Sequence, residues 1–393
     1  MTLISIIFLV QVLTLPFVIL RTVIQYYTTG TVLLRAHSEF ANSLYKNVHM
    51  AIEYHFIDHF TRDDVAVFMY QPAKMYFSKY RNHPFAKGLR GFGDRINDRT
   101  YWVVKSNEPE HSKGKSALLF FHGGGFCVNM FATQFIGILG TYHSVPEPQK
   151  SKLLVALLDY SLTCHYANYP TQIFQAMEAY RELVRAGYTD ITLIGDSAGG
   201  NLAGAISRFI AYPEEAMEQF SRYKEFNWDF SPVLQPANII WISPWVEPYT
   251  KPKLIPGTNN WGDLGSSGGG LGTWYIEGSK EKDVEAFVNL NITNYKQHWS
   301  KVDAVNGKGR SLYIYGELEV LRHGMEVFVD LITKEGNGKL ETYMEKGGIH
   351  DGLFYVESLD HMNNWGGQKA LDSKFKGKYA HNLVGKFLGE VIG

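Results

Sequence analysis

The sequence predicts an α/β fold, in which helices flank a mostly parallel central sheet. Short apolar runs typical of buried strands lie at residues 117–121, 191–194, 238–242, 311–316 and 340–344. The first two of these runs are each followed at once by a glycine-rich turn, and a helix start follows the second turn at residues 199–206. Strands that lead through short turns into helices are typical of α/β proteins. With 393 residues and 45% hydrophobic content, the chain can bury a sizeable core.

The turn after residues 191–194 carries a candidate nucleophile. Gly-Asp-Ser-Ala-Gly at residues 195–199 places Ser197 between a strand and a helix, the arrangement known as a nucleophile elbow. Such a turn holds the serine in a strained conformation with its hydroxyl exposed, and flanking residues without a Cβ leave room for the crossing backbone. A chance match in a chain with 38 glycines is the alternative.

The turn after residues 117–121 has the sequence His-Gly-Gly-Gly-Phe, at residues 122–126. Acyl transfer needs backbone N–H donors aimed at the developing oxyanion, and a triple-glycine turn lets the backbone approach closely. The turn precedes Ser197 by 75 residues (197 − 122), which is the expected order of oxyanion loop and nucleophile. A flexible glycine loop without a catalytic role is the alternative, and the elbow downstream weakens it.

A nucleophilic serine also needs a base and an orienting acid, in the chain order serine, acid, histidine. Glu317 and Glu319 follow the strand at residues 311–316, and His350 lies on a glycine-flanked loop after the strand at residues 340–344. The other histidines lack that context. His350 is therefore the candidate base, and its carboxylate partner would fix the imidazole tautomer and stabilise the imidazolium.

These motifs resemble the hormone-sensitive-lipase-like branch of the α/β-hydrolases. The acid loop of that family usually has the sequence Gly-x-x-Asp-x-Leu-Arg-Asp, and residues 316–323 match it with Glu319 at the acid position. His323 stands where the family often has aspartate. The resemblance implies a serine ester hydrolase without metal or organic cofactor. It also implies that the N–H groups of Gly124, Gly125 and Ala198 bind the oxyanion.

Three further stretches resemble the fungal steryl acetyl hydrolases, which are endoplasmic-reticulum membrane enzymes that remove acetyl groups from sterol esters. They are the apolar N-terminus, residues 159–172 and residues 243–246. This narrower resemblance implies a lipophilic ester substrate, namely an acetylated sterol. Two alternatives stay open: a broad carboxylesterase or arylacetamide deacetylase-like enzyme, and a non-catalytic receptor of the same fold. The presence of His350 argues against the receptor.

Charge and cysteine content exclude several classes of protein. The formal net charge is −1, from 38 basic and 39 acidic residues, and no basic cluster is prominent, so nucleic-acid binding is disfavoured. Cys127 and Cys164 are the only cysteines, and their spacing fits neither a metal site nor a disulfide framework. We expect two buried free thiols, with a single disulfide as the alternative. The oligomeric state is not predicted.

The N-terminus differs from the rest of the chain. Residues 1–20 carry no charged side chain and would span about 30 Å as a helix, which fits a bilayer core. We expect a single-pass membrane anchor there. A cleaved signal peptide and a cap helix over the active site are the alternatives; a signal peptide would need a basic start and a small-residue cleavage site, which are missing. Residues 21–100 are expected to form a cap or linker region with early strands such as residues 65–69, and residues 101–393 the catalytic domain.

Two observations disagree about the side of the membrane on which the catalytic domain lies. Arg21, Arg35 and Lys46 follow the anchor, and the positive-inside rule then places the catalytic domain in the cytosol. The steryl acetyl hydrolase resemblance implies the lumen of the endoplasmic reticulum instead, and the glycosylation sequence at residues 291–293 permits it. We expect a lumenal domain.

Two insertions interrupt the catalytic domain, at residues 212–236 and 250–275. The second contains Trp261, Trp274 and a Gly-Ser cluster at residues 265–270. It is either a surface loop or a lid whose aromatic rings contact a lipophilic substrate.

Overall fold

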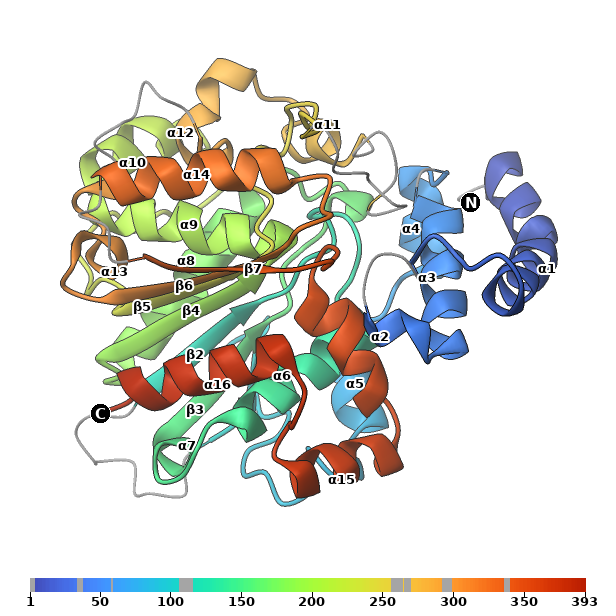
Figure 1. Ribbon diagram of the computed structural model, residues 1–393. Helices are drawn as coiled ribbons and strands as arrows, with labels where there is room; N and C mark the ends of the chain where they lie inside the picture. The colour runs from blue at the N-terminus through green and yellow to red at the C-terminus, as the bar shows by residue number, and fades with distance from the viewer. Residues whose placement is uncertain are drawn as a thin grey trace.

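A seven-stranded sheet forms the centre of the molecule (Figure 1). The computed structural model describes residues 4–33, 38–57, 59–105, 116–255, 264, 270–291, 299–335 and 340–393. The strands are β1 (Thr100–Val104), β2 (Ser116–Phe121), β3 (Leu153–Leu158), β4 (Asp190–Asp196), β5 (Asn238–Ile242), β6 (Arg310–Gly316) and β7 (Leu340–Glu345). Their order is β1-β3-β2-β4-β5-β6-β7, and every neighbouring pair is parallel except β1 and β3. The predicted fold class is confirmed.

Strand register places the loops of the candidate site at one edge of the sheet. Phe121 at the end of β2 pairs with Gly195 near the end of β4, so the glycine loop and the elbow leave the sheet side by side. At the same edge, Gly316 at the end of β6 pairs with Glu345 at the end of β7. The acid loop and the histidine loop therefore also start from neighbouring strands.

Helices cover both faces of the sheet (Figure 1). One layer contains α8 (Thr171–Arg185), α9 (Ser197–Ala211) and α14 (Arg322–Glu335), and the other contains α6 (Ala132–Ser144) and α16 (Tyr379–Val391). Alternate side chains of β2 enter opposite cores: Leu119 and Phe121 join the first, Leu118 and Phe120 the second. Because both faces are covered, the whole strand is apolar rather than alternating.

Shorter elements connect these layers. They are α7 (Gln149–Lys152), η2 (Thr163–His165), α10 (Pro213–Phe220), α11 (Leu271–Tyr275), η3 (Glu281–Asp283), α12 (Glu285–Val288), α13 (Asp303–Asn306), the π-helix η5 (Gly352–Glu357), η6 (Ser358–His361) and α15 (Asn364–Ser373).

The N-terminal region is helical and corrects one prediction. It contains α1 (Ile6–Tyr27), α2 (Ser38–Ala41), α3 (Leu44–Ile57), α4 (Arg62–Phe68) and α5 (Ala73–Lys79). The strand expected at residues 65–69 is wrong, because those residues lie in and just after α4. The hydroxyl of Thr61 accepts from the backbone N–H of Asp64, whose carboxylate accepts from the N–H of Thr61. This capping box starts a helix. Among the described residues before Thr100, no strand is present.

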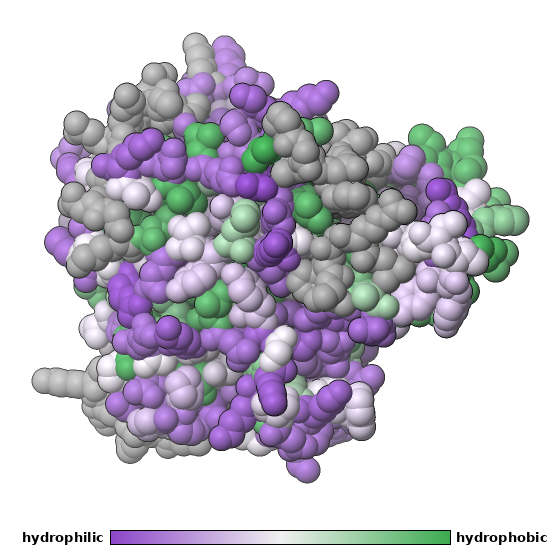
Figure 2. All heavy atoms as spheres, in the orientation of Figure 1, coloured by the Kyte–Doolittle hydropathy of each residue, from purple (hydrophilic) through white to green (hydrophobic). Residues whose placement is uncertain are grey.

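Helix α1 extends past the predicted end of the anchor, to Tyr27. Its 22 residues are long and apolar enough to cross a membrane by length and composition. It lies beside α3 at the edge of the molecule (Figure 1). Figure 2 shows hydrophobic side chains gathered at that edge.

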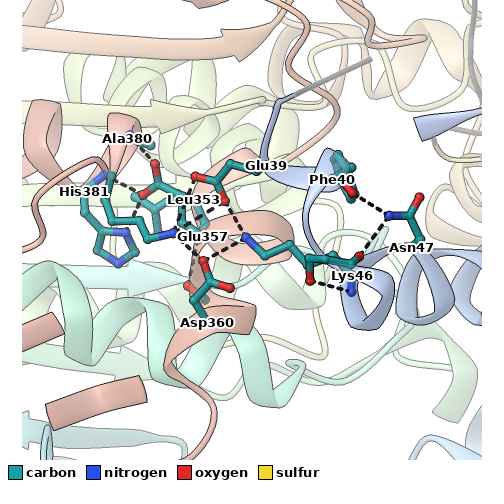
Figure 3. A network of polar contacts seen from close by, with 12 residues as sticks. Glu39, Phe40, Lys46, Asn47, Leu353, Glu357, Asp360, Ala380 and His381 are labelled. Carbon is teal, nitrogen blue, oxygen red and sulfur yellow. Dashed lines mark hydrogen bonds and ion pairs between the residues drawn. The ribbon is translucent and has the colours of Figure 1, made fainter. Parts of the chain in front are cut away.

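A buried ionic network fixes α2 and α3 on the catalytic domain (Figure 3). The Lys46 ammonium, with a side chain only 2% exposed, donates to Glu39 and, at 2.8 Å, to Asp360 of η6. Lys378, just before α16, also donates to the Asp360 carboxylate. Removal of one partner from such a network leaves a buried charge without compensation, so these residues hold the N-terminal helices in one position.

Three further expectations concern the cysteines, the glycosylation motif and the second insertion. Cys127 and Cys164 are buried free thiols, as predicted. The side-chain amide of Asn291, at the start of the predicted glycosylation sequence, is buried and donates to the carbonyl of Gly324 at 2.8 Å. A glycan on Asn291 would require the hydrogen bond to Gly324 to break. The glycosylation motif therefore gives the lumenal placement no structural support. Trp261 and the Gly-Ser cluster lie outside the described residues, except for Gly270.

Candidate active site

Ser197 is the first residue of α9, directly after β4. Its φ is +48°, in the left-handed region that non-glycine residues rarely adopt. A Cβ at Gly199 would lie 1.9 Å from the carbonyl oxygen of Phe121, and one at Gly195 would lie 2.3 Å from the carbonyl oxygen of Gly199. Both flanking glycines are therefore required by close backbone contacts, as the elbow motif predicts.

The glycine loop lies against this elbow. Gly124 and Gly125 have φ values of +105° and +59°, which only glycine adopts without strain. The buried carboxylate of Asp196 accepts from the backbone N–H of Gly123 at 3.0 Å and from the side-chain amide of Gln134. Asp196, which directly precedes Ser197, thus ties the glycine loop to the elbow.

Two buried titratable groups support this loop. Burial raises the pKa of Asp196 to about 6, against the opposing effect of its hydrogen bonds. Burial lowers the pKa of His122 to about 4, so its ring is neutral at pH 7 and stacks on Tyr160 with ring centroids 4.2 Å apart. The Tyr160 hydroxyl donates to the carbonyl of His122 at 2.6 Å. His122 is therefore a packing residue beneath the loop.

Glu319 and His350 form a buried pair. His350 Nδ1 lies 2.8 Å from Glu319 Oε2, and the exposed fractions of the two residues are 4% and 2%. The other oxygen of Glu319 accepts from the hydroxyl of Ser243 at 2.6 Å and from the backbone N–H of Gly316. Glu317 instead accepts from the backbone N–H of Gly347 at 2.8 Å. Of the two glutamates on the loop, Glu319 is thus the one that contacts the imidazole.

Sequence reasoning missed two residues that hold this pair. Asp351 has a φ of +52°, which turns its carboxylate to within 3.2 Å of His350 Nε2. Ser243 accepts from the backbone N–H of Asp351 at 3.0 Å while it donates to Glu319. The left-handed turn at Asp351 has no sequence signal beyond its place after the histidine.

Ser197, His350, Gly124 and Gly125 line one cavity of about 340 Å³. Ala198 is the second residue of α9, and the first N–H groups of a helix have no partner inside that helix. The remaining walls are almost entirely apolar and come from the catalytic domain, α1, α3 and α4. They include Phe8, Met50, Tyr54, Phe56, Ile57, Phe60, Phe68, Val128, Phe131, Trp245, Leu264, Leu271, Val320 and Tyr355.

The second insertion contributes to this cavity only in part. Leu264 and Leu271 line it, whereas Trp274 holds Arg62, whose guanidinium lies 5.4 Å from the indole ring centroid. Among the described residues, no group of three or more His, Cys, Asp or Glu side chains is placed to hold a metal ion.

Comparisons with known proteins agree with this architecture. Residues 6–375 match the family model of the steryl acetyl hydrolases. The protein mug81 of Schizosaccharomyces pombe, named provisionally as a steryl acetyl hydrolase, is 26% identical over 379 residues, which cover 90% of this chain and 91% of that protein. Steryl acetyl hydrolase 1 of Saccharomyces cerevisiae is 23% identical over 265 residues, covering 63% of this chain and 57% of that protein.

Solved structures show the same fold. An esterase from the bacterial hormone-sensitive lipase family aligns with a TM-score of 0.54 and 19% identity, over 88% of this chain and 96% of the esterase. A hormone-sensitive lipase from a metagenome library aligns with a TM-score of 0.52 and 17% identity, over 81% and 89% of the two chains. The fold and the family model lead to one conclusion. The chain belongs to the steryl acetyl hydrolase family of carboxylic ester hydrolases.

Proposed function

We propose that this chain is a serine hydrolase that removes the acetyl group from acetylated sterols. The observation that carries the proposal is the buried Glu319–His350 pair, whose imidazole lines the same apolar cavity as Ser197. A nucleophile, a base and an orienting carboxylate in that relation form the arrangement used for acyl transfer.

In this mechanism, the Ser197 hydroxyl attacks the ester carbonyl while His350 takes its proton. Glu319 accepts the proton on Nδ1, which leaves Nε2 as the basic nitrogen, and it stabilises the imidazolium. The N–H groups of Gly124, Gly125 and Ala198 hold the oxyanion of the tetrahedral intermediate. His350 then protonates the leaving alcohol, and water, deprotonated by His350, releases acetate from Ser197.

The apolar cavity supports a lipophilic alcohol. Its volume of about 340 Å³ lies in the range of small-molecule sites. The relatives named as steryl acetyl hydrolases favour a sterol as the alcohol. We propose the endoplasmic-reticulum membrane as the location, as the family resemblance implies. Helix α1 would attach the enzyme to that membrane, either as the single pass that its length predicts or along the membrane surface.

An assay of the purified full chain on three esters tests the substrate. We expect hydrolysis of a sterol acetate and of a short-chain aryl acetate, and little hydrolysis of a long-chain sterol ester. Turnover of the aryl acetate without turnover of the sterol acetate would instead favour a broad arylacetamide deacetylase-like enzyme. Failure to hydrolyse any ester would favour the non-catalytic receptor.

A further inference from the structure

Helix α1 is attached to the catalytic domain at its N-terminal end. The backbone N–H and the hydroxyl of Ser5, which caps α1, donate to the two oxygens of the Asp64 carboxylate at 2.9 and 2.7 Å. The same carboxylate starts α4. One turn into α1, Phe8 stacks on Phe68 at a centroid distance of 4.2 Å and forms part of the cavity wall. The start of α1 thus lies at the candidate active site.

The C-terminal end of α1 contacts α2 and α3, which are attached to the catalytic domain. The Tyr26 hydroxyl donates to the carbonyl of Ala41 at 3.2 Å, and Thr31, just after the helix, donates to Asn47 of α3. Asn47 donates in turn to the carbonyl of Phe40 at 2.8 Å (Figure 3). Between the two ends, the imidazole of His55 on α3 contacts the carbonyl of Gln11 at 3.0 Å and the hydroxyl of Thr14 at 3.1 Å.

These contacts are incompatible with a helix that crosses a bilayer. A helix of 22 residues is about 33 Å long, close to the thickness of the hydrocarbon core. If α1 crossed it, Ser5 and Thr31 would lie on opposite sides. Asp64, together with Arg62 and Asp63 at the start of α4, would then have to follow Ser5 through the hydrocarbon. Charged side chains there are costly.

The exposed surface of α1 is nevertheless largely apolar, with Arg21 as its one charged residue. Ile6, Leu13, Phe17 and Tyr27 are each more than 70% exposed, and Figure 2 shows the hydrophobic surface at this edge of the molecule. Thr14 points to α3, and Thr22 is buried. A continuous exposed apolar surface of this kind marks an interaction site.

We propose that α1 lies flat in one leaflet of a lipid bilayer, with its outward face in the acyl chains, and does not cross the membrane. This inference rests on the proposed membrane attachment and replaces the single pass. Phe8 is buried on the face of α1 that is turned to the domain and belongs to the cavity wall, so the cavity lies directly behind the helix that rests in the leaflet. An ester dissolved in the membrane then has a short path around α1 to Ser197.

Protease protection of a doubly tagged chain tests the topology. The full chain carries one epitope before Met1 and another after Gly393, and it is expressed in sealed microsomes. We expect protease to remove both epitopes or neither, because both ends stay on one side. Removal of one epitope with protection of the other would overturn the proposal. Ester hydrolysis is not part of this readout, so the result does not depend on the proposed activity.

A substitution on the outward face tests lipid contact. Leu13→Glu with Phe17→Glu should abolish flotation of the purified chain with phosphatidylcholine vesicles and leave hydrolysis of a water-soluble aryl acetate unchanged, since neither residue lines the cavity. Trp365 on α15 is 73% exposed and serves as the matched control, so Trp365→Glu should still float. Undiminished flotation of the double variant would overturn the proposal. If the double variant lost a stable dimer but still floated, the proposal would also be overturned, because the outward face would then bind a second copy of the chain.

Discussion

Two buried glutamate–histidine pairs in this molecule are alike in chemistry and differ in surroundings. Glu319 and His350 lie 2.8 Å apart at the edge of the sheet, and Glu357 and His381 lie 2.6 Å apart between η5 and α16. In both pairs the carboxylate contacts Nδ1. In both, backbone N–H groups also donate to the carboxylate: that of Gly316 to Glu319, and those of Ala380 and His381 to Glu357.

The surroundings of the imidazole ring distinguish the two pairs. The His350 imidazole lines the cavity that also contains Ser197, whereas His381 Nε2 faces Gly140, where an added Cβ would lie 2.6 Å away. An imidazole that contacts a buried carboxylate can therefore serve packing or chemistry, and a shared cavity with a nucleophile decides which. We infer that the Glu357–His381 pair holds the C-terminal helix on the domain.

The largest expected effect separates the serines beside the two pairs. Ser197→Ala should lower kcat for an aryl acetate by about 10⁴ to 10⁶, because removal of a nucleophile leaves only binding and oxyanion stabilisation. Ser358→Ala is the matched control near the second pair, where the Ser358 hydroxyl donates to the carbonyl of Leu353. It should change kcat by less than about threefold, as expected for a residue outside the site. Equal losses in the two folded variants would reject Ser197 as the nucleophile.

The two carboxylates give the next largest effect. Glu319→Gln should lower kcat by about 10³ to 10⁴, since a neutral amide can neither fix the tautomer nor stabilise the imidazolium. Glu357→Gln should keep near-normal kcat but lower the free energy of unfolding by about 1 to 3 kcal/mol, because it weakens the buried hydrogen bonds that the Glu357 carboxylate accepts. Glu317→Gln controls for the loop. If Glu317→Gln proves more damaging to kcat than Glu319→Gln, the acid has been misassigned.

Local motifs predicted five of the seven strands, the elbow, the glycine loop and the Glu319–His350 contact, because each depends on residues close together in the chain or on a fixed chain order. The helix α4 was missed because the continuous apolar run at 65–69 fits a buried strand, and the capping contact of Thr61 with Asp64 outweighs that pattern. The contact of Asp351 with His350 depends on one backbone dihedral, and the wall formed by Phe8 depends on how distant helices pack. Neither is encoded in a short motif.

Acid pH should weaken both regions, through one buried histidine in each. Burial lowers the pKa of His122, under the glycine loop, to about 4 and that of His361, beside His381, to about 3. An unfolded histidine titrates near pH 6.5, so stability is complete above that value and falls as the unfolded state takes up protons below it. We expect a loss of about 1 to 2 kcal/mol per histidine between pH 7 and pH 5.

Urea unfolding at the two pH values measures this loss. The raised pKa of Asp196, about 6, acts in the opposite direction: the folded state binds that proton first, so stability increases as the pH falls from 6 toward 4. His361→Gln removes one of the two buried histidines, so the free energy of unfolding of this variant should fall less between pH 7 and pH 5 than that of the wild type. Equal stability of the wild type at pH 7 and pH 5 would show that the buried histidines do not govern it.

The smallest expected effect concerns the choice of substrate in the cavity beside the Glu319–His350 pair. Phe8→Ala removes part of the cavity wall supplied by α1 and should lower kcat/KM for a sterol acetate about tenfold, the usual scale for a lost apolar contact. The same change should leave kcat/KM for a small aryl acetate within about threefold. Comparable losses on both esters would indicate that Phe8 supports the fold of the site rather than the alcohol pocket.

The central claim is that the Glu319–His350 pair serves Ser197. The most direct measurement is acid quenching of the enzyme during turnover of an acetate ester, followed by mass spectrometry of the peptides. The account predicts an acetyl group on the peptide that contains Ser197, and none at that site in Ser197→Ala. An acetyl group that accumulates on another residue, or the same labelling in the alanine variant, would contradict it.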